Sequence, residues 1–446
     1  SDLSPETFWC HNMNWDFLIQ NKESLLVSTD TRNLPAGCVF FALHGERFDG
    51  NKFALQALEQ GASLAVIDDP EVFATLTSSP HHLITSSPIA HRPSPIAHGP
   101  LLLVEDTLLA LQDLARAWRR ELGLPIIGIT GTNGKTTTKE LLAAVLSTKY
   151  NLHYTQGNLN NQIGVPLTLL QITRAHELAI VEMGASHPGD IKELVEIAEP
   201  NYGLITNVGR AHLEGFGSFE GVQRTKQELY DYLLKHYGAI FRNADNPYLL
   251  RMHQNAIDTN YRYKVKAERL NKHYVYTTGK LPSGTHLVGE YNAENVSAAM
   301  CVGEYFGVSR EQALEAIRAY VPTNNRSQAM QTANNQLIVD AYNANPTSMQ
   351  AAINAFKGDT YILGAMRELG EYSHLEHQNI VNMLAERKAD CVFLVGEEYL
   401  QTTSPYPVFE NVELLHKYLE GQPIKGKNIL LKGSRSTKME KLLDIL

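Results

Sequence analysis

The stretch from Ile126 to Thr138 contains the residue types that bind nucleotide phosphates. It reads Ile-Ile-Gly-Ile-Thr-Gly-Thr-Asn-Gly-Lys-Thr-Thr-Thr, so an apolar run ends in a glycine-rich turn, and a helical apolar pattern follows directly. Glycines allow backbone N–H groups to turn toward phosphate oxygens, and the N-terminus of the next helix adds partial positive charge. The sequence therefore predicts a phosphate-binding loop with the candidate residues Gly131, Thr132, Asn133, Gly134, Lys135, Thr136 and Thr137.

Two side chains of this loop have distinct predicted roles. Lys135 would reach the β- and γ-phosphates, and the hydroxyl of Thr136 would hold Mg²⁺. Ile129 departs from the strict pattern, which has its first glycine at that position. A turn-rich loop with an incidental lysine is the alternative interpretation. The loop alone indicates a nucleotide-dependent enzyme or a nucleotide-dependent switch.

Polar residues follow two more apolar stretches. Glu182 ends the run 178–182, and a carboxylate at the carboxyl end of a parallel strand faces the crevice where ligands bind. It would complete a Mg²⁺ shell, since Mg²⁺ is bound by few carboxylates together with phosphate oxygens; a strand-capping acid is the alternative. His212 comes just after the run 203–206, and Lys226 lies in the helical stretch 219–234. Taken alone, a structural histidine and a surface lysine are the simpler interpretations of these two residues.

The elements that position these residues alternate between strands and helices, which predicts an α/β fold with mostly parallel sheets. We expect three domains: a small N-terminal α/β domain (1–123), a central P-loop ATPase-type parallel sheet with its helices (124–323), and a C-terminal Rossmann-like α/β domain (324–446). The predicted strands are 38–43, 62–67, 101–104, 126–130, 178–182, 203–206, 238–241, 336–340, 359–363, 391–395 and 428–431. The predicted helices are 53–60, 106–122, 135–148, 189–198, 219–234, 291–306, 309–320, 346–356, 374–388 and 410–420.

Two connecting segments stand outside this alternation. Residues 77–100 are rich in Ser, Pro and His, and Ser-Pro-Ile-Ala-His occurs twice in them, which predicts a surface loop. A metal site in this loop is less favoured, because no acidic or cysteine partner is nearby in the sequence. Residues 321–325 read Val-Pro-Thr-Asn-Asn and predict the linker before the C-terminal domain.

The composition indicates a globular protein of the cytoplasm. Hydrophobic residues make up 43% and charged residues 20% of the 446 residues, and the net charge of −9 disfavours nonspecific binding to nucleic acid. No apolar run is long enough to span a membrane. The four cysteines lack metal-ligand spacing, so we expect them to be reduced core residues: Cys10, Cys38, Cys301 and Cys391. We expect a monomer that binds no nucleic acid and does not insert into a membrane.

Motifs along nearly the whole chain resemble those of the Mur ligase family of ATP-dependent amide-forming enzymes. The motifs are Ser28-Thr-Asp-Thr-Arg32, Phe40-Phe-Ala-Leu-His-Gly45, Asp49-Gly50, Gly131–Thr137, Gly157–Pro166, Glu182-Met-Gly184, Asn207–Gly217, Tyr291–Asn295, Asp340–Pro346, Gly364–Gly370 and Lys432–Arg435. The Asn-Ala-Asn-Pro and Met-x-Glu-Leu-Gly elements resemble those of the family members that add D-alanyl-D-alanine. One departure is Ala365, which stands where many relatives carry aspartate.

The resemblance implies a function and a set of site residues. A carboxylate of UDP-N-acetylmuramoyl-tripeptide would be phosphorylated by ATP with Mg²⁺, and D-alanyl-D-alanine would attack the acyl phosphate. Lys135 and Arg326 would contact the γ-phosphate, Asn295 the adenine and Asp340 the ribose. Thr136 and Glu182 would hold one Mg²⁺, and His212 with a carbamylated Lys226 would hold or orient a second. The implied substrate-binding residues are Asp30, Thr31, Arg32 and Gly45 for the UDP end, with Asn158 and Asn161 in the central domain, and Asn343, Asn345 and Arg435 for the dipeptide.

Three other functions remain open at this point. Another Mur-type ligase or a folylpolyglutamate synthase-like ligase would share the three-domain build, but the latter needs a pterin pocket rather than the motifs in residues 28–50. A P-loop switch protein would not need Glu182, His212, Arg326 and Asp340 together. The sequence leaves open whether diaminopimelate or lysine stands third in the acceptor peptide.

Overall fold

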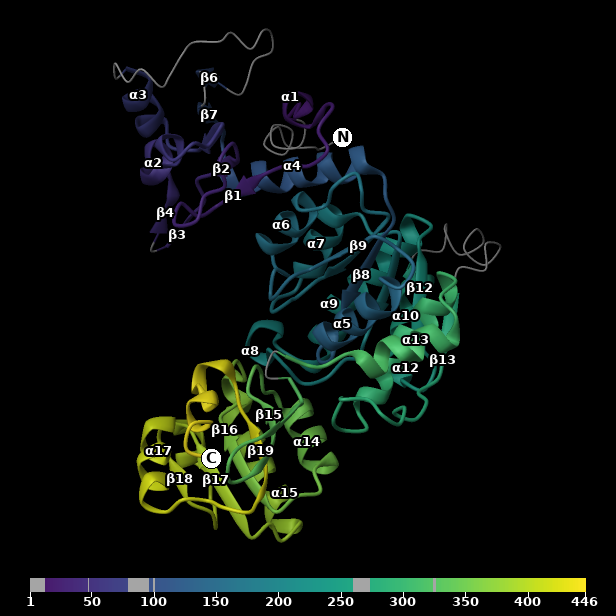
Figure 1. Cartoon of the computed structure of the whole chain (residues 1–446), viewed down its shortest axis with the longest axis vertical. Helices are drawn as coiled ribbons and strands as arrows, with labels where there is room; N and C mark the ends of the chain where they lie inside the picture. The colour runs from purple at the N-terminus through teal and green to yellow at the C-terminus, as the bar shows by residue number, and fades with distance from the viewer. Residues whose placement is uncertain (1–12, 47, 79–95, 99–100, 260–272, 324–325) are drawn as a thin grey trace. The chain divides into compact units, whose positions relative to one another are not determined.

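The computed structural model of this chain describes residues 13–46, 48–78, 96–98, 101–259, 273–323 and 326–446 (Figure 1). The chain divides into two compact units. The first consists of residues 1–127, 151–183 and 193–200, and the second of residues 128–150, 184–192 and 201–446. Among the described helices, none is long and apolar enough to cross a membrane.

The first unit contains a five-stranded sheet in the order β1-β2-β5-β7-β6. Strands β1, β2, β5 and β7 are parallel, and β6 pairs antiparallel with β7. Fully buried side chains such as Phe40, Ala65 and Leu101 make its core. The elements are α1 (Asp16–Ile19), β1 (Val27–Ser28), β2 (Val39–Phe41), the hairpin β3 (His44–Gly45) and β4 (Phe48–Asp49), η2 (Gly50–Phe53), α2 (Ala54–Glu59), β5 (Leu64–Ile67), α3 (Pro70–Ser78), β6 (Ile96–His98) and β7 (Leu101–Leu103).

A long helix, α4 (Thr107–Leu122), follows this sheet. Asp106 caps its N-terminus by accepting a hydrogen bond from the Leu109 N–H, and Gly123 ends it with a φ of 63°, a left-handed conformation that glycine adopts without strain. Trp118 on its buried face donates its indole N–H to the carbonyl of Ile172, 2.9 Å away. The helix is therefore fixed at both ends and along its apolar face.

The central sheet has six strands in the order β13-β12-β11-β8-β10-β9. The pairs β9–β10, β11–β12 and β12–β13 are parallel, as the alternation of strands and helices predicts. Its strands are β8 (Ile126–Thr130), β9 (Leu152–Tyr154), β10 (Leu178–Glu182), β11 (Tyr202–Ile205), β12 (Ala239–Asn243) and β13 (His273–Tyr276). Its helices are α5 (Lys135–Leu146), α6 (Gly164–Leu170), α7 (Asp190–Ala198), α8 (Leu213–Phe216), α9 (Phe219–Lys235), α10 (Pro247–Thr259), α12 (Asn292–Tyr305) and α13 (Arg310–Ala319). Helices α12 and α13 pack on α5, the helix that follows the glycine-rich turn.

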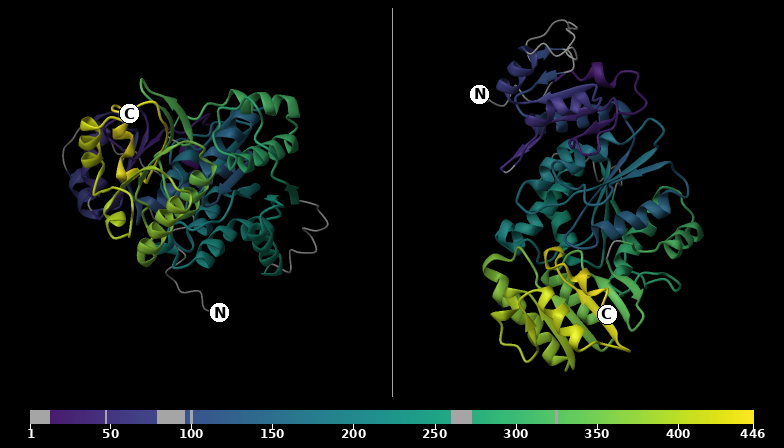
Figure 2. Two further views of the ribbon diagram at one scale, coloured as in Figure 1. Left: turned by 90° about the horizontal axis from the view of Figure 1, so that it is seen from below. Right: turned by 60° about the vertical axis from the view of Figure 1, so that its left-hand side comes forward.

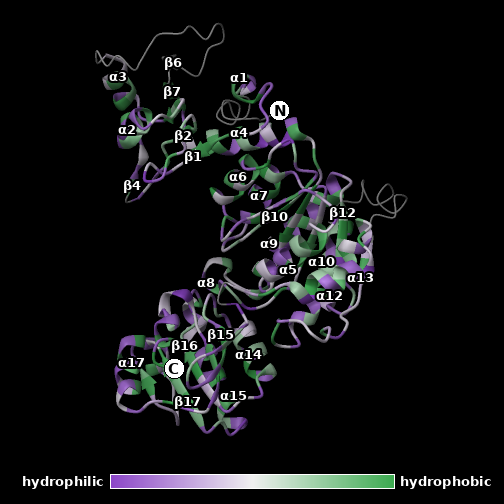
Figure 3. Ribbon diagram, viewed as in Figure 1, coloured by the Kyte–Doolittle hydropathy of each residue, from purple (hydrophilic) through white to green (hydrophobic). Residues whose placement is uncertain are grey.

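The C-terminal sheet also has six strands, in the order β14-β15-β19-β16-β17-β18. All its neighbouring pairs are parallel except β14–β15, which is antiparallel. Helices lie on both of its faces (Figure 2), and its strands are mostly hydrophobic (Figure 3). The elements are β14 (Gln328–Gln331), β15 (Gln336–Asp340), α14 (Pro346–Ala355), β16 (Thr360–Gly364), η3 (Gly370–Tyr372), α15 (Ser373–Glu386), β17 (Cys391–Val395), α16 (Glu397–Leu400), β18 (Val408–Phe409), α17 (Val412–Gly421), β19 (Asn428–Lys432), η4 (Arg435–Thr437) and η5 (Met439–Leu442).

Three sequence expectations need correction or lie outside the described residues. Within the predicted surface loop 77–100, residues Ile96–His98 form strand β6, because their backbone groups pair with β7; residues 79–95 and 99–100 are outside the described part. Cys38 is buried as predicted, but Cys301 and Cys391 are only half-buried. These three cysteines are free, and Cys10 lies outside the described residues. Of the predicted linker, residues 324–325 are also outside.

Candidate active site

The glycine-rich turn after β8 requires glycine at two positions. Gly131 has a φ of 147°, and a Cβ there would lie 2.0 Å from Oγ1 of Thr206. Gly134 has a φ of 77° at the N-cap of α5, and a Cβ there would lie 2.4 Å from Oδ1 of Asn295. Ile129 is fully buried inside β8, so the position of the first glycine in the strict pattern belongs to the strand here. The turn therefore forms a tight backbone cradle at the start of a helix.

A second loop, which follows β11, braces this turn. The Asn133 N–H donates to Oδ1 of Asn207 at 3.0 Å, and the Thr206 hydroxyl donates to the Asn133 carbonyl at 2.6 Å. The Gly209 N–H donates to Oγ1 of Thr132 at 3.0 Å. Thr206, Asn207 and Gly209 were not predicted to have a role. Their position after β11 could have indicated one, because side chains at the carboxyl ends of neighbouring parallel strands lie close together.

Lys135 lies over the turn as the first residue of α5. Its Nζ donates to the carbonyl oxygens of Gly131 at 2.8 Å and of Thr132 at 3.2 Å. Thr136, the next residue, is 3% exposed. The cradle, the lysine and the hydroxyl group have the chemistry that fits the phosphates of a nucleotide.

Lys226 is a buried lysine of α9. It is 2% exposed, because Val222, Leu229 and Leu233 lie at helical spacing around it and turn the same face of the helix inward. The interpretation as a surface lysine is therefore wrong. Burial lowers the pKa of Lys226 well below its usual value of 10.5, the charge of Lys135 lowers it further, and Asp190 and Glu228 act in the opposite direction. The side chain is consequently an amine that readily gives up its proton.

His212 stands at the N-cap of α8 with a φ of 51°, which is rare for a residue other than glycine. Its Nδ1 is paired with a carboxylate oxygen of Glu368, whose φ is 60°. This hydrogen bond is the main reason that the pKa of Glu368 is below its usual value. Two strained residues are thus held against each other, and strain of this kind is found mainly at functional sites. Glu368 was not among the candidate site residues, although it belongs to the Met-x-Glu-Leu-Gly motif.

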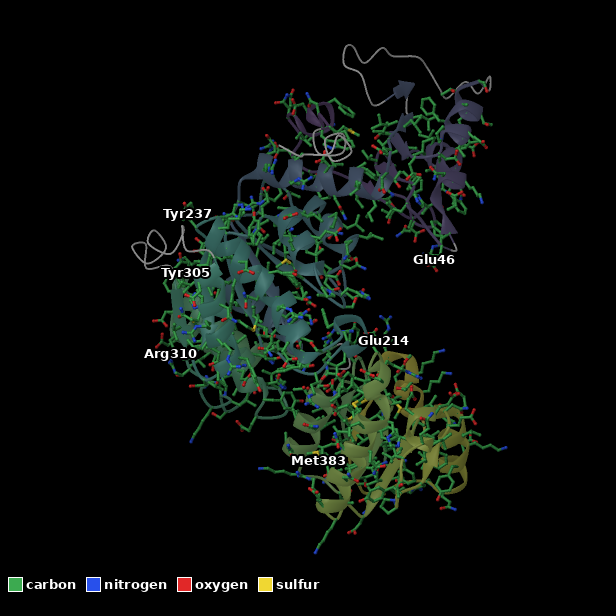
Figure 4. The ribbon with its side chains drawn as sticks, turned by 180° about the vertical axis from the view of Figure 1, so that it is seen from behind. Glu46, Glu214, Tyr237, Tyr305, Arg310 and Met383 are labelled. Atoms are coloured by element: carbon green, nitrogen blue, oxygen red, sulfur yellow. The ribbon has the colours of Figure 1, made fainter. Side chains whose placement is uncertain are left out.

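Further contacts join the loop 207–217 to residues 347–376 within the second unit. The Arg210 guanidinium donates to Glu376 at 2.7 Å, and the Arg210 N–H donates to Oγ1 of Thr347 at 2.9 Å. Glu214, labelled in Figure 4, donates its backbone N–H to the carbonyl of Glu368 at 3.3 Å. Glu376 is 1% exposed, so Arg210 neutralises a buried carboxylate.

Two asparagines predicted to bind ligands contact the phosphate loop or its helix in this structure. Asn295 accepts from the Thr138 hydroxyl at 3.0 Å and donates to Asn292 at 3.0 Å, behind Gly134. Asn345 caps α14 by accepting from the Ser348 N–H at 2.9 Å, and its Nδ2 donates to Oδ1 of Asn133 at 2.7 Å. Their roles toward adenine and the dipeptide stay predictions.

The remaining candidates of the second unit lie around β15 and β19. Asp340, at the end of β15, is paired with Lys432 at 2.5 Å, and Lys432 also donates to the carbonyl of Asn343 at 3.3 Å. Lys432 is 1% exposed, whereas the Asn343 side chain is exposed. Arg326 and Arg435 both lie near the ring of Tyr342. The structure therefore brings Asp340, Asn343, Arg326 and Arg435 into one region at the carboxyl ends of two neighbouring strands.

The first unit holds the other candidates. Glu182 is 1% exposed at the end of β10, and the Asn160 amide donates to its Oε1 at 2.9 Å. Asn161 accepts from the N–H of Gly164, the first residue of α6, at 2.8 Å, and Asn158 is exposed. Asn160, which holds the carboxylate, was not predicted as a site residue.

In the loop that follows β1, Asp30 and Arg32 pair with each other. Nη2 of Arg32 lies 2.5 Å from Oδ2 of Asp30, and this pairing lowers the pKa of Asp30 to about 2. Thr31 is half-buried between them, and Gly45 lies in the exposed hairpin strand β3. All four residues are on accessible loops or edges, where they would be free to meet a ligand.

Two of the predicted Mg²⁺ ligands, Thr136 and Glu182, are each of a residue type that Mg²⁺ accepts as a ligand. Among the described residues there is no cluster of three or more His, Cys, Asp and Glu side chains that would hold a metal by themselves. In the second unit, the hydroxyl of Thr136 lies in the first turn of α5 and is a hard oxygen donor. In the first unit, the carboxylate of Glu182 ends β10 and is a donor of the same kind. Mg²⁺ typically combines one or two such groups with phosphate oxygens and water.

The fold and these sites agree with three matches to family models. They are "Mur ligase family, catalytic domain" on residues 25–119, "Mur ligase middle domain" on residues 129–303 and "Mur ligase, glutamate ligase domain" on residues 325–435. The chain belongs to the Mur ligase family.

Individual relatives are similar over nearly the whole chain. The UDP-N-acetylmuramoyl-tripeptide–D-alanyl-D-alanine ligase of Bacillus subtilis (strain 168) is 35% identical, over 94% of this chain and 92% of the relative. A crystal structure of MurF from Acinetobacter baumannii is 29% identical with a TM-score of 0.73, over 94% of this chain and 92% of that chain. The structure of MurF ligase from Thermotoga maritima in complex with ADP is 25% identical with a TM-score of 0.75, over 95% and 97%.

Proposed function

We propose that this chain is an ATP-dependent ligase that joins D-alanyl-D-alanine to UDP-N-acetylmuramoyl-tripeptide in the synthesis of peptidoglycan precursors. The observation that carries the proposal is the braced phosphate loop with Lys135 over it, in a chain 35% identical to a ligase of that name. A folylpolyglutamate synthase-like function is less favoured, because the match to the tripeptide ligase includes the N-terminal sheet and its motifs in residues 28–50.

The reaction requires a carboxylate to become an acyl donor. A carboxylate oxygen of the tripeptide attacks the γ-phosphorus of ATP, the bond from that phosphorus to the bridging oxygen breaks, and ADP leaves. The amine of D-alanyl-D-alanine then attacks the acyl carbon, the bond to the phosphate oxygen breaks, and the amine loses a proton. Lys135 and Arg326 would stabilise the charge on the transferred phosphoryl oxygens. When bound, Mg²⁺ neutralises phosphate charge, and Thr136 and Glu182 would hold it.

Each predicted domain has a part in this proposal. Residues 1–123 would bind the UDP end through Asp30, Thr31, Arg32 and Gly45, and residues 124–323 would bind ATP, with Asn295 at the adenine and Asn158 and Asn161 near the acceptor. Residues 324–446 would supply Asp340 to the ribose and Asn343, Asn345 and Arg435 to the dipeptide. We propose a monomer in the cytoplasm, where ATP and nucleotide-linked precursors are available.

Lys226 would act as a carbamate. A neutral amine nitrogen attacks the carbon of CO₂, an N–C bond forms, and one proton leaves, so the lowered pKa of Lys226 supports the reaction. The resulting anion offers oxygen atoms to Mg²⁺ and suits a site that also holds Lys135. Lys226→Ala should lose most activity, and short-chain carboxylic acids should restore part of it by filling the vacated anion position. Full activity of Lys226→Arg, which forms no stable carbamate, would contradict this role.

The test of the proposed function is ADP release with UDP-muramoyl-tripeptide, measured with and without D-alanyl-D-alanine. We expect release to depend on the dipeptide and the pentapeptide product to appear by mass spectrometry. Comparison of diaminopimelate- and lysine-containing acceptors would identify the third residue. Dipeptide-independent ATP hydrolysis without any ligated product would refute the proposal.

A further inference from the structure

Tyr342 lies in the turn between β15 and α14, and two cationic side chains meet on its ring. The guanidinium carbon of Arg326 is 3.8 Å from the ring centroid, and that of Arg435 is 5.7 Å from it. Both distances are within the range of a cation–π interaction. One arginine precedes β14 and the other follows β19, so the tertiary structure alone brings them together.

The residue after Arg326 is fixed by a side-chain contact, and Arg326 itself keeps an unused donor. The hydroxyl of the next residue, Ser327, lies 2.5 Å from the hydroxyl of Tyr291, and Ser327 has a φ of 49°. The Nε atom of Arg326 is buried and has no hydrogen-bond partner among the described residues. A buried donor of this kind costs free energy unless a partner arrives. An incoming anion would satisfy it.

The charges around Tyr342 favour an anion as that partner. Two guanidinium groups near one ring repel each other, and the negative face of the ring offsets part of this repulsion. Asp340, the nearby carboxylate, is already paired with Lys432 at 2.5 Å and so leaves the arginines without an acidic partner from that residue. Guanidinium groups bind phosphate and carboxylate oxygens in a bidentate manner.

We propose that Tyr342 is a positioning residue whose ring holds Arg326 and Arg435 next to each other, so that the γ-phosphoryl group and the carboxylate of the incoming dipeptide bind at neighbouring points. This inference rests on the proposed function, which gives Arg326 the phosphoryl group and Arg435 the dipeptide. Both arginines contact the same ring. When one anion binds its arginine, it fixes the position of the ring, and the ring in turn fixes the second arginine for the second anion. The two substrates should therefore bind with positive coupling.

The experiment compares three replacements of Tyr342 with a matched control. Tyr342→Phe keeps the ring, whereas Tyr342→Leu and Tyr342→Met remove it in two different shapes, so a folding defect of one variant does not decide the result. Tyr418→Leu is the control, because it removes an exposed ring from helix α17 of the same C-terminal part of the chain. We expect Tyr342→Phe and Tyr418→Leu to stay within about 2-fold of wild type. Loss of the ring should raise KM for D-alanyl-D-alanine by roughly 2- to 30-fold, the range of a cation–π interaction.

Coupling provides the readout that a merely structural tyrosine would not change. Titration calorimetry would measure the Kd of D-alanyl-D-alanine with and without a non-hydrolysable ATP analogue. We expect the analogue to lower this Kd in the wild type and in Tyr342→Phe but not in the ring-less variants. In an Arg435→Ala background, loss of the ring should raise KM for the dipeptide no further.

Several results would overturn the inference. They are unchanged KM and coupling in both ring-less variants, an equal loss in Tyr342→Phe, or effects of Tyr342 and Arg435 that add fully. Failure of the proposed function is distinguishable, because a wild-type protein without dipeptide-dependent ADP release fails at that earlier step. If the wild type is active and Arg326→Ala and Arg435→Ala are impaired, a normal Tyr342→Leu variant contradicts only the role of the ring.

Discussion

Replacing the buried Lys226 by methionine should raise the free energy of unfolding, most at low pH. The unfolded chain exposes the amine, which then holds a proton below about pH 10.5, whereas burial in α9 holds the pKa of the folded state well below that value. The unfolded state therefore binds more protons in the interval between the two pKa values, so the wild type gains stability as the pH rises, at up to about 1.4 kcal/mol per pH unit. Methionine has a similar length and no proton to lose. The advantage of Lys226→Met should consequently shrink at about that slope as the pH approaches 10.5.

The assay is urea unfolding followed by circular dichroism between about pH 7 and 10, in CO₂-free buffer without nucleotide. Removal of CO₂ keeps the lysine unmodified, so that only proton binding contributes. Lys235→Met is the matched control, because Lys235 is an exposed lysine in the last turn of the same helix. Parallel pH curves for the wild type and Lys226→Met, or an equal gain in Lys235→Met, would refute the reasoning from burial.

Three further predictions follow from single contacts. Lys135→Ala should lower kcat by roughly 100- to 1,000-fold, as expected for the loss of one group that stabilises transition-state charge, while urea unfolding stays at the wild-type midpoint; near-normal ligation would contradict the phosphate-loop assignment. Gly134→Ala should weaken ATP-analogue binding in calorimetry, because the added Cβ would meet Asn295 Oδ1 at 2.4 Å, and unchanged affinity would show that the turn tolerates a side chain. Arg210→Ala should destabilise the protein by about 1–3 kcal/mol in urea unfolding, since Glu376 is left buried without its cation; the double variant with Glu376→Gln should recover part of this loss, and no recovery would speak against the pairing.

Whether a strand was predicted from the sequence depended on its position in the sheet: the interior strands were predicted and the edge strands were missed. The strands predicted from apolar runs, such as β8, β10, β16 and β19, all lie inside a sheet. The missed strands β1, β6, β9, β13, β14 and β18 are the edges of the three main sheets. An interior strand of an α/β sheet is covered on both faces and needs a continuous apolar run, whereas an edge strand is part-exposed and short. The burial of β14, which alternates between half-buried and exposed residues, shows why no run was visible.

The sequence by itself determined the phosphate loop, since the chemistry of Gly131, Gly134 and Lys135 is local to one turn between a strand and a helix. It also determined the α/β class, because the apolar periodicity of each segment depends only on near neighbours. The tertiary structure decided which distant groups meet. The burial of Lys226, the pairing of His212 with Glu368 and the two arginines on Tyr342 depend on residues far apart in the chain. Exposure and pKa depend on the surrounding packing, which distant parts of the chain complete, as Lys135 does beside Lys226.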